Sequence, residues 1–593
     1  MNRLEADILR YLLDNPYTNQ RTISEDVGLS IGTVNKALKS LLAEGYLDTS
    51  LRLSENAWTT LNLMRPRQAV ILAAGFGMRM IPINSQTPKA LIEVHGQALI
   101  ERIIEQLHSV GITEITIVVG FMKEKFDFLI DKYGVELLVN NEYAAKNNLH
   151  SLALAADKIE NAYIIPGDLW CAENPFRRYE LYSWYMVSDK KDANSDILVN
   201  RKTELVSAGK NSHGNSMIGI AYLAGREAAV VAQGLKARDN ESKYYDKFWE
   251  AVLYSDNGKL LVPARIVSAA DYVEINTYEQ LRELDKNSNQ LNSDAIRSIA
   301  EALRVRPEDI RDIKVLKKGM TNRSFLFSCR GTKYIMRIPG EGTDKLINRR
   351  QEAEVYGVIR GKGLCDDLVY INPDNGYKIT RYIENVRTAD AFNMADVAQC
   401  MEKLRALHGM NLSVAHEFKL FETIDYYETL WNGTPSVYRD YTETKRQVFE
   451  LKPFILSHAG QRTLCHIDSV ADNFLFAPEA DGKETLQLTD WEYAGMQDPH
   501  IDLAMFCIYS HYNKQQCDRL VDIYFEGHCP PAIRAKIYCY IAACGLLWSN
   551  WCEYKCNLGV EFGEYAMAQY RYAKDFYKYA AEQIAGLGAT DNV

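Results

Sequence analysis

The sequence predicts a multidomain chain in which an α/β unit and an α+β unit follow a small helical module. The 593 residues are too many for one hydrophobic core, since a domain usually holds about 100 to 200 residues. The apolar run at 69–74 precedes a glycine-rich turn, as the buried first strand of a parallel sheet does. The polar loop at 465–473 precedes two short apolar runs, which predict a hairpin. We expect domains at 1–65, 66–290 and 291–593.

Composition and charge indicate a globular protein of the cytoplasm. Hydrophobic residues make up 47% and charged residues 25% of the chain, which is typical of globular domains. The net charge of −10 argues against a general binder of polyanions. The 12 cysteines form no C-x-x-C pair, so we expect reduced thiols. We expect neither a secretory leader nor a membrane span, because no apolar run reaches about 18 residues.

Residues 1–65 predict three helices and a wing. Apolar residues recur at helical spacing near the start, and Ile23 to Val27 predicts a short second helix. Ser30 is placed to cap a third helix that ends before Gly45, and Tyr46 to Leu53 suggests a small β-wing. This order resembles the winged helix-turn-helix of bacterial regulators.

The charge of this module leaves its partner open. The third helix carries only Lys36 and Lys39 as cations, whereas a DNA footprint should be basic. We therefore weigh DNA as a partner against a dimerisation or regulatory role, and the charge favours the second. The sequence does not decide whether the protein is a homodimer.

The central segment carries a phosphate-binding turn. A buried strand over Ala69 to Ala74 leads into Gly75-Phe76-Gly77-Met78-Arg79, where backbone N–H groups can approach phosphates closely. Met80 stands where the dinucleotide-binding fingerprint needs a third glycine, so that motif is excluded. Pro88-Lys89 adds a second cation for the same phosphates.

The pattern L-A-A-G-x-G-x-R followed by P-K resembles nucleotidyltransferases that join a nucleoside triphosphate to a phosphorylated small molecule and release pyrophosphate. The residues that follow look most like the bacterial choline-phosphate cytidylyltransferases. The resemblance implies a Rossmann-like α/β fold, CTP as the nucleotide, and catalytic roles for Arg79 and Lys89. It implies nucleotide contacts from Ala73, Ala74, Gly75, Gly77 and Ser151.

Two segments of this domain are candidates for a Mg²⁺ site. Tyr163 to Pro166 predicts a strand that ends in Gly167-Asp168, and ligands of open α/β sheets lie beyond the carboxyl ends of strands. The alternative is a loop aspartate that caps the next helix. The second ligand is expected at Asn276, where the family commonly has aspartate, and an amide oxygen can also bind Mg²⁺.

An aromatic cluster is the candidate site for a trimethylammonium head, which binds by cation–π contact. We propose Trp249 first, and aromatic side chains in the core are the alternative. The other candidates are Trp184, Tyr185, Phe248 and Glu250.

The third segment begins with strand, turn, strand. Ile313 to Leu316 and Phe325 to Ser328 flank a polar turn that includes Thr321 and Asn322, both expected to contact a nucleotide. A third strand then presents Arg337, and Glu352 on the next helix is its expected ion-pair partner, as Lys and Glu are in kinases. Arginine in place of that lysine resembles the choline kinases. The resemblance implies the protein-kinase-like fold of choline kinases and aminoglycoside phosphotransferases.

The stretch from Cys465 to Glu492 has the spacing of a phosphotransferase catalytic loop. A kinase needs a carboxylate at the acceptor hydroxyl and oxygen ligands for Mg²⁺, and H-x-D-x-x-x-x-N before a strand ending in Asp supplies them. Asp468 is the expected catalytic residue, and Asn473 and Asp490 are the expected metal ligands. The alternative is an ordinary polar turn of a hairpin.

Neighbours of these residues receive supporting roles. His466 is placed with the catalytic residues and would brace the loop, as Asp502 would. D-W-E-Y-A-G is similar to the choline/ethanolamine kinase family, and Glu492 is expected to support a second metal ion.

A quaternary ammonium group donates no hydrogen bond, so an aromatic box suits it. Choline kinases carry pocket tryptophans in a matching W-x-x-W, and helix core is the alternative. The expected choline-binding residues here are Trp548, Trp551, Tyr493 and Phe562.

The two catalytic segments describe successive steps. ATP would phosphorylate choline, and CTP would then condense with phosphocholine to give CDP-choline and pyrophosphate for cell-surface decoration, with Mg²⁺ as cofactor. One alternative is an ethanolamine or 2-aminoethylphosphonate pathway. Another is a DNA-binding regulator whose catalytic domains are vestigial.

Overall fold

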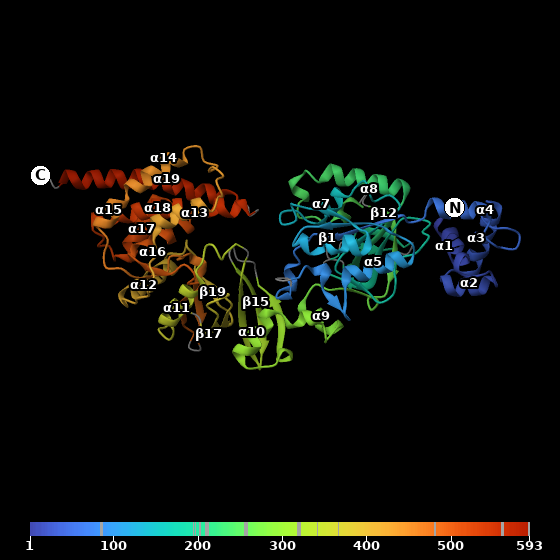
Figure 1. Cartoon of the computed structure of the whole chain (residues 1–593), viewed down its shortest axis with the longest axis horizontal. Coiled ribbons are helices and arrows are strands. Elements are labelled where there is room, and N and C mark those ends of the chain that lie inside the picture. The colour runs from blue at the N-terminus through green and yellow to red at the C-terminus, as the bar shows by residue number, and fades with distance from the viewer. Residues whose placement is uncertain are drawn as a thin grey trace. The chain divides into compact units, whose positions relative to one another are not determined.

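The computed structural model describes residues 1–83, 87–193, 195, 197–200, 203–207, 213–253, 259–316, 322–340, 342–365, 367–479, 482–558 and 562–590. They form two compact units, Met1–Ser293 and Asp294–Val593 (Figure 1). The boundary that the sequence predicts between the first two domains stays a prediction.

The N-terminal module contains four helices. They are α1 (Arg3–Asp14), α2 (Gln20–Val27), α3 (Ile31–Ala43) and α4 (Glu55–Leu63). As predicted, the Ser30 hydroxyl caps α3 by accepting a hydrogen bond from the Thr33 N–H at 3.2 Å. The wing is reduced to a single bridge between Leu47 and Leu53.

Helix α4 is not predicted by the local sequence. Its sequence, ENAWTTLNL, is short and rich in residues of low helix propensity, so its local signal is weak. Ala57 and Leu61 are fully buried in the core of the module. Packing of this face therefore decides that the segment is helical.

A nine-stranded sheet organises the rest of the first unit, in the order β5-β4-β1-β6-β11-β8-β12-β10-β9. Strands β5, β4, β1 and β6 are parallel to one another. The strand bounds are β1 (Gln68–Ala73), β4 (Glu114–Val119), β5 (Glu136–Val139), β6 (Ala162–Pro166), β8 (Trp184–Asp192), β9 (Ile197–Val199), β10 (Glu204–Ser207), β11 (Gly214–Leu223) and β12 (Lys259–Val267).

Helices cover both faces of this sheet. Helices α5 (Leu99–Ser109) and α6 (Phe128–Tyr133) pack against one face, while α7 (Asn148–Leu154) and α8 (Gly225–Arg238) pack against the other (Figure 1). The two-stranded ribbon of β7 (Leu169–Cys171) and β13 (Tyr272–Glu274) lies beyond the carboxyl end of β6.

The second unit begins with helix α10 (Asp294–Leu303) and an antiparallel sheet in the order β14-β15-β16-β18-β17. The strands are β14 (Ile310–Val315), β15 (Asn322–Cys329), β16 (Thr332–Pro339), β17 (Leu368–Ile371) and β18 (Lys378–Arg381). Helix α11 (Arg349–Ile359) lies between β16 and β17 in the chain.

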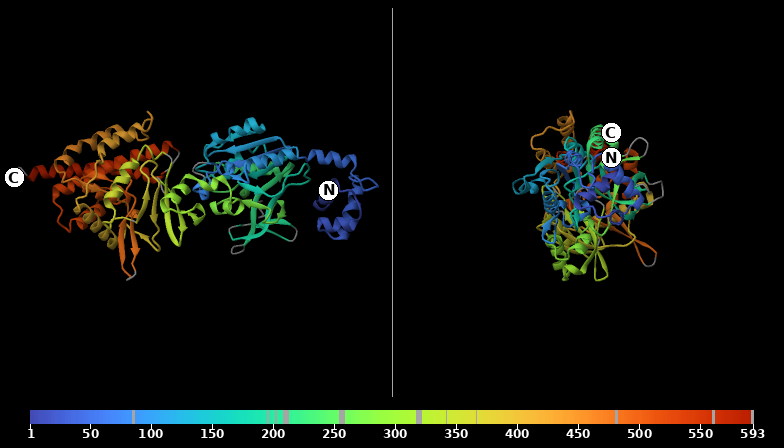
Figure 2. Two further views of the ribbon diagram at one scale, coloured as in Figure 1. Left: turned by 60° about the horizontal axis from the view of Figure 1, so that its bottom comes forward. Right: turned by 90° about the vertical axis from the view of Figure 1, so that its right-hand side faces the viewer.

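The larger part of this unit is helical. Its helices are α12 (Met394–Gly409), α13 (Leu420–Thr429), α14 (Tyr441–Glu450), α15 (Lys452–Ser457), α16 (His500–Tyr509), α17 (Lys514–Tyr524), α18 (Pro531–Asn557) and α19 (Glu564–Thr590). Helices α18 and α19 pack side by side along much of their length (Figure 2). None of the helices in the described ranges combines the length and apolarity needed to cross a bilayer.

The predicted hairpin is confirmed. Strands β21 (Phe474–Pro478) and β22 (Glu484–Leu488) pair antiparallel, and β19 (Arg387–Thr388) extends them. A second short ribbon pairs β20 (Thr463–Cys465) with β23 (Gly495–Gln497). The loop from Cys465 to Phe474 therefore starts on one ribbon and ends on the other.

Candidate active sites

A cavity of about 840 Å³ opens at the carboxyl ends of β1 and β6. Cavities of this size commonly hold small ligands. Its lining contains all but one of the site residues that the sequence placed in this domain, the exception being Trp184. They are Ala73, Ala74, Gly75, Gly77, Arg79, Lys89, Ser151, Asp168, Tyr185, Phe248, Trp249, Glu250 and Asn276. We call this space the transferase cavity.

The glycine-rich turn brings a cation against the predicted metal ligands. Gly77 has φ of +66°, and a Cβ there would lie 3.3 Å from the Lys89 side chain. Lys89 Nζ donates to an Asp168 carboxylate oxygen and to Asn276 Oδ1, the latter at 2.7 Å. Arg79 Nη2 donates to the same Asn276 oxygen at 2.9 Å. The two predicted cations and the two predicted ligands thus share one point in the cavity.

The oxygen donors at this point suit Mg²⁺. Asp168 offers a carboxylate and Asn276 an amide oxygen, which are hard ligands of the kind Mg²⁺ prefers. Glu274, two residues before Asn276, also lines the cavity and was not singled out from the sequence. Glu274 could not be identified from the sequence, since a single glutamate at the end of a short strand belongs to no motif with a recognisable spacing.

Another part of the cavity lining is acidic and aromatic. Tyr185 OH donates to Glu250 Oε1 at 2.9 Å, and the Trp249 ring lies 5.9 Å from that of Tyr185. Burial raises the pKa of Glu250 to about 7. Phe248 is 61% exposed, and it also lines the cavity. A cationic group would meet both carboxylate charge and aromatic faces here.

Trp184 does not belong to this cavity, which corrects one of the five candidates. Consecutive residues of a strand point to opposite faces of a sheet, so Trp184 and Tyr185 point apart. Trp184 is buried in the core on the other face, where the Arg265 guanidinium lies 4.7 Å from its ring.

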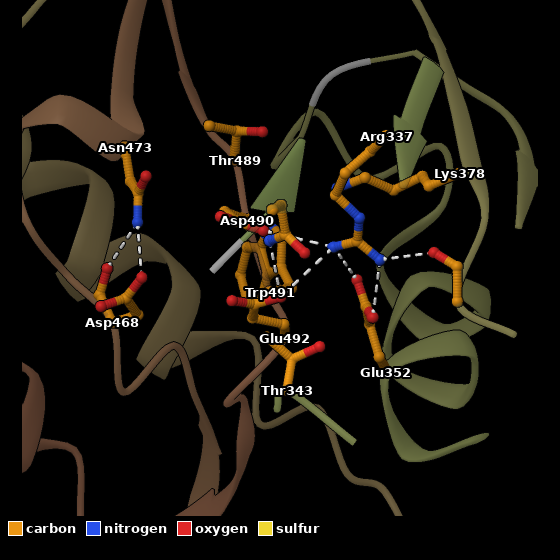
Figure 3. A network of polar contacts seen from close by, with 12 residues as sticks. Arg337, Thr343, Glu352, Lys378, Asp468, Asn473, Thr489, Asp490, Trp491 and Glu492 are labelled. Atoms are coloured by element: carbon orange, nitrogen blue, oxygen red, sulfur yellow. Dashed lines mark hydrogen bonds and ion pairs between the residues drawn. The ribbon is translucent and has the colours of Figure 1, made fainter. Parts of the chain in front are cut away.

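The second unit holds a charged network around Arg337 (Figure 3). Its guanidinium forms a two-pronged ion pair with Glu352, Nη1 to Oε1 at 2.6 Å and Nη2 to Oε2 at 2.8 Å. Both side chains are buried. Although burial by itself would raise it, Arg337 holds the pKa of Glu352 below its usual range. The strand arginine and helix glutamate are therefore paired as the sequence predicts.

The catalytic loop brings Asp468 and Asn473 into contact. Asn473 Nδ2 donates to the Asp468 carbonyl oxygen at 2.8 Å and to Asp468 Oδ2 at 3.0 Å. These bonds use the amide nitrogen, so the amide oxygen of Asn473 is the atom that we expect to bind a metal ion. Tyr509 OH donates to Asp468 Oδ1 at 2.6 Å. Burial raises the pKa of Asp468 to about 7. Asp490 lies with Oδ1 3.4 Å from Arg337 Nη1 (Figure 3).

His466 is a positioning residue, and the structure corrects its place among the catalytic residues. It is fully buried, and its Nε2 lies 2.8 Å from the Thr489 carbonyl oxygen, just before Asp490. Asp502 accepts from the backbone N–H groups of His466 at 2.9 Å and Ile467 at 2.7 Å. Ile467 has φ of +68°, which is strained for a β-branched residue. Asp502 therefore stabilises a strained loop.

Glu492 was expected to support a metal ion. In this structure its carboxylate contacts two arginine side chains and the side-chain amide of Asn322. Its Oε2 accepts from Asn322 Nδ2 at 2.9 Å and from Arg349 Nη1 at 3.2 Å. Arg349 also bonds Glu352 at 3.1 Å, and its Nη2 donates to Thr343 Oγ1 at 3.1 Å. Sequence reasoning missed Arg349, because nothing in the string distinguishes it from Arg350 beside it. Thr321 lies outside the described residues.

The four predicted choline-binding residues lie together. The Trp548 ring lies 5.4 Å from that of Tyr493 and 5.5 Å from that of Trp551, and the Trp551 ring lies 5.3 Å from that of Phe562. Tyr509, which contacts Asp468, is 5.5 Å from Trp548. The tryptophans are 4% and 2% exposed and belong to the core of this unit. An aromatic wall therefore adjoins the catalytic loop.

These two sites define a chain with two enzymatic centres for phosphorus transfer, one on an α/β sheet and one on a kinase-like fold. Three family models match it along its length. They are the winged helix-turn-helix DNA-binding model over residues 1–48, the MobA-like NTP transferase domain over 69–181 and the choline/ethanolamine kinase model over 313–523.

The relatives identify the family. The choline-phosphate cytidylyltransferase of Streptococcus pneumoniae is 31% identical over 37% of this chain and the whole of that protein. The 2-aminoethylphosphonate cytidylyltransferase of Lancefieldella rimae is 31% identical over 37% of this chain and 91% of its own length. The crystal structure of the choline kinase LicA from S. pneumoniae is 28% identical, with a TM-score of 0.41, covering 48% of this chain and 97% of that one. The chain belongs to the family of the choline-phosphate cytidylyltransferases, and its second half contains a region that matches the choline/ethanolamine kinase model.

Proposed function

We propose that the chain makes CDP-choline in two steps. The kinase site phosphorylates choline with ATP, and the transferase cavity joins the resulting phosphocholine to CMP from CTP and releases pyrophosphate. The observation that carries this proposal is that one chain holds both acid-centred sites, around Asp468 and around Asp168. The product of the first step is then the acceptor of the second. CDP-choline would supply phosphocholine for decoration of the cell surface.

The kinase site narrows the class of acceptor. A kinase of this type transfers phosphate to a hydroxyl group, which choline and ethanolamine carry. Because 2-aminoethylphosphonate already carries phosphorus bonded to carbon and has no hydroxyl, it gives the kinase no role. The presence of the Asp468 site therefore favours choline or ethanolamine over the phosphonate, although a relative that acts on the phosphonate is equally similar.

The acceptor pocket favours choline over ethanolamine. A primary ammonium group needs hydrogen-bond acceptors for three N–H groups, whereas a trimethylammonium group needs only apolar and aromatic surface. The wall beside Asp468 is built from Trp548, Trp551 and Tyr493. In the transferase cavity, Trp249 and Phe248 supply aromatic surface, and Glu250 and Glu274 supply the opposite charge.

The kinase residues divide the work of phosphoryl transfer. Asp468 would accept the proton of the choline hydroxyl, held in place by Asn473 and Tyr509. Arg337, fixed by Glu352, would contact the ATP phosphates. Asn473 and Asp490 would hold Mg²⁺, which when bound neutralises charge on the phosphates.

The transferase residues act mainly by charge and position. A phosphocholine oxygen would attack the α-phosphorus of CTP in line, and pyrophosphate would leave. Lys89 and Arg79 would neutralise the triphosphate, and the glycine-rich turn would present backbone N–H groups to it. Asp168 and Asn276 would hold Mg²⁺, which when bound neutralises charge on the triphosphate.

Product analysis of the purified chain tests the proposal. With ATP, CTP, Mg²⁺ and choline, we expect phosphocholine first and then CDP-choline with pyrophosphate. Phosphorus NMR detects each of these products. Parallel reactions with ethanolamine and with 2-aminoethylphosphonate should be slower. Faster turnover of ethanolamine would assign the other substrate. Negligible turnover of all three, together with salt-dependent binding to DNA, would support the rival function of a regulator with vestigial catalytic domains.

A further inference from the structure

The winged helix shares its hydrophobic core with a segment of the transferase fold. This segment, residues 172–183, contributes Leu181, which is 6% exposed, to the same core as the four N-terminal helices. Tyr179 and Tyr182 pack against that core, and the Trp58 ring of α4 meets the Tyr179 ring edge-on at 6.2 Å. We call residues 172–183 the docking segment.

Polar contacts fix the same interface. Tyr182 OH donates to Asp7 Oδ1 of α1 at 2.7 Å, and the Arg3 guanidinium lies 5.7 Å from the Tyr182 ring. Tyr222 OH, from strand β11, donates to the Met64 carbonyl oxygen at 2.6 Å. A buried apolar contact with directional bonds around it holds one arrangement, unlike a flexible tether.

The docking segment is clamped from its other side by the transferase core. Glu180 is 1% exposed, and it accepts from Tyr163 OH at 2.9 Å. Arg265 Nη1 lies 3.9 Å from Glu180 and donates to the Pro175 carbonyl oxygen at 3.1 Å. Glu180 therefore points into the transferase, while Tyr179 and Leu181 on either side of it pack against the winged helix.

The docking segment lies in the chain between β7 and β8, and β8 contributes Tyr185 to the lining of the transferase cavity. It follows β7, which begins directly after Asp168 and pairs with the strand that carries Glu274. It leads into β8, whose second residue is Tyr185, the hydrogen-bond partner of Glu250. A shift of this segment would therefore act on Asp168 through β7 and on Tyr185 through β8.

We propose that the winged helix is a built-in control module of the transferase site. Its docked position holds residues 172–183, and through them Tyr185 with its partner Glu250, in the geometry that binds phosphocholine. This inference rests on the proposed function, and it adds how that site is regulated. Coupling between two sites of this kind typically changes affinity by roughly 5- to 150-fold.

The outer face of α3 stays available in the docked state. Docking uses α1 and α4, whereas Ile31, Lys36 and Lys39 of α3 are exposed. A ligand on that face could therefore act on the docked module. The proposal does not need that ligand to be DNA, and so few cations make a poor footprint for DNA.

Two variants of the full chain test the inference. Tyr182→Phe removes only the hydroxyl that donates to Asp7, and the double variant Trp58→Ala/Leu181→Ala removes the apolar contact. We expect faster amide hydrogen exchange at residues 179–182 in both. We expect the KM for phosphocholine to rise by at least about fivefold in the double variant and less in the single one.

Two controls make the result specific. Leu63→Ala changes an apolar residue of the same helix α4 that is 65% exposed, and it should alter neither exchange nor KM. Phosphorylation of choline by the same preparations should keep its rate, since Asp468 lies in the other unit. A loss of both activities would show general unfolding and would reject the inference.

Other outcomes also decide. Faster exchange with unchanged transfer kinetics would show that the winged helix merely covers an apolar patch. Unchanged exchange and kinetics in the double variant would show that these contacts do not hold the segment. If the unsubstituted chain transfers no cytidylyl group, the proposed function fails instead. A change confined to the variants bears on this inference alone.

Discussion

Arg349 connects the two glutamates of the kinase site. It bonds Glu352 of α11 and Glu492 of the D-W-E motif, and its own side chain is almost fully buried. Gly376 has φ of +70°, and a Cβ there would lie 2.6 Å from the Arg349 side chain. Position 376 must therefore be glycine, because any larger side chain would collide with Arg349. Arg349 therefore positions both carboxylates and supplies part of the positive charge that balances them.

We expect Arg349→Met to lower the kcat/KM of choline phosphorylation by at least about tenfold, because it leaves buried carboxylates short of a partner. Arg349→Lys should lose less, since it keeps the charge but not the fork of N–H groups. Steady-state kinetics with varied ATP measures both. Arg350→Met, at an exposed position next to it, is the matched control. Equal losses at 349 and 350 would contradict the positioning role.

Glu250 gives the transferase step a predicted pH dependence. Burial raises its pKa to about 7, so the carboxylate is neutral below that pH and charged above it. A cationic acceptor binds the charged form better. The KM for phosphocholine should therefore rise as the pH falls through about 7. The phosphate of the acceptor also changes its charge in this range, so the KM is first corrected for that ionisation. Glu250→Gln should flatten this dependence and raise the KM at pH 8, and a profile identical to that of the unsubstituted chain would exclude Glu250 from the pocket.

At the scale of elements, the pair α18 and α19 stabilises the kinase unit. The helices approach closely at Gly545, where a Cβ would lie 2.6 Å from Tyr572 Cβ and 2.8 Å from the Gln569 carbonyl oxygen. Trp548 and Trp551 lie on α18 just beyond this contact. The position of the aromatic wall therefore depends on how closely the two helices pack.

Gly545→Ala should lower the free energy of unfolding of the second unit by about 1 to 3 kcal/mol, because overpacking forces the helices apart. Urea unfolding followed by tryptophan fluorescence measures this change. Gly357→Ala on α11 is the control, since a Cβ there meets no heavy atom within 4 Å. The control should be neutral or slightly stabilising, as alanine favours helix. A Gly545→Ala chain as stable as the control would show that the helices can move apart freely.

At the scale of the whole molecule, Asp168 and Asp468, the acidic residues that we propose for the two reactions, lie in separate compact units. Asp468→Asn should abolish phosphocholine formation and leave cytidylyl transfer from supplied phosphocholine intact, because Asp168 is untouched. Asp168→Asn should do the converse. Each reaction, assayed alone by product analysis, serves as the folding control for the other. Loss of both activities from a folded single variant would contradict the independence of the sites.

Much of the fold could be predicted from local sequence. The strand at 68–73, the glycine-rich turn, the hairpin of β21 and β22 and the helix capped by Ser30 each follow from a short run of residues whose spacing has a physical meaning. Helix α4 could not be predicted, because its helicity comes from burial of Ala57 and Leu61. Trp184 and Tyr185 could not be separated either, since the register of β8 decides which of them faces the cavity.

The sequence by itself determined the chemistry of this protein. The glycine-rich turn with its cations and the H-x-D-x-x-x-x-N loop name the reacting groups, because such chemistry needs particular side chains at particular spacings along one strand or loop. Only the tertiary structure decided which distant residues support them. Arg349, Tyr509, Glu274 and the docked winged helix act across gaps of tens to hundreds of positions, and contacts of that kind depend on how elements pack and not on any local pattern.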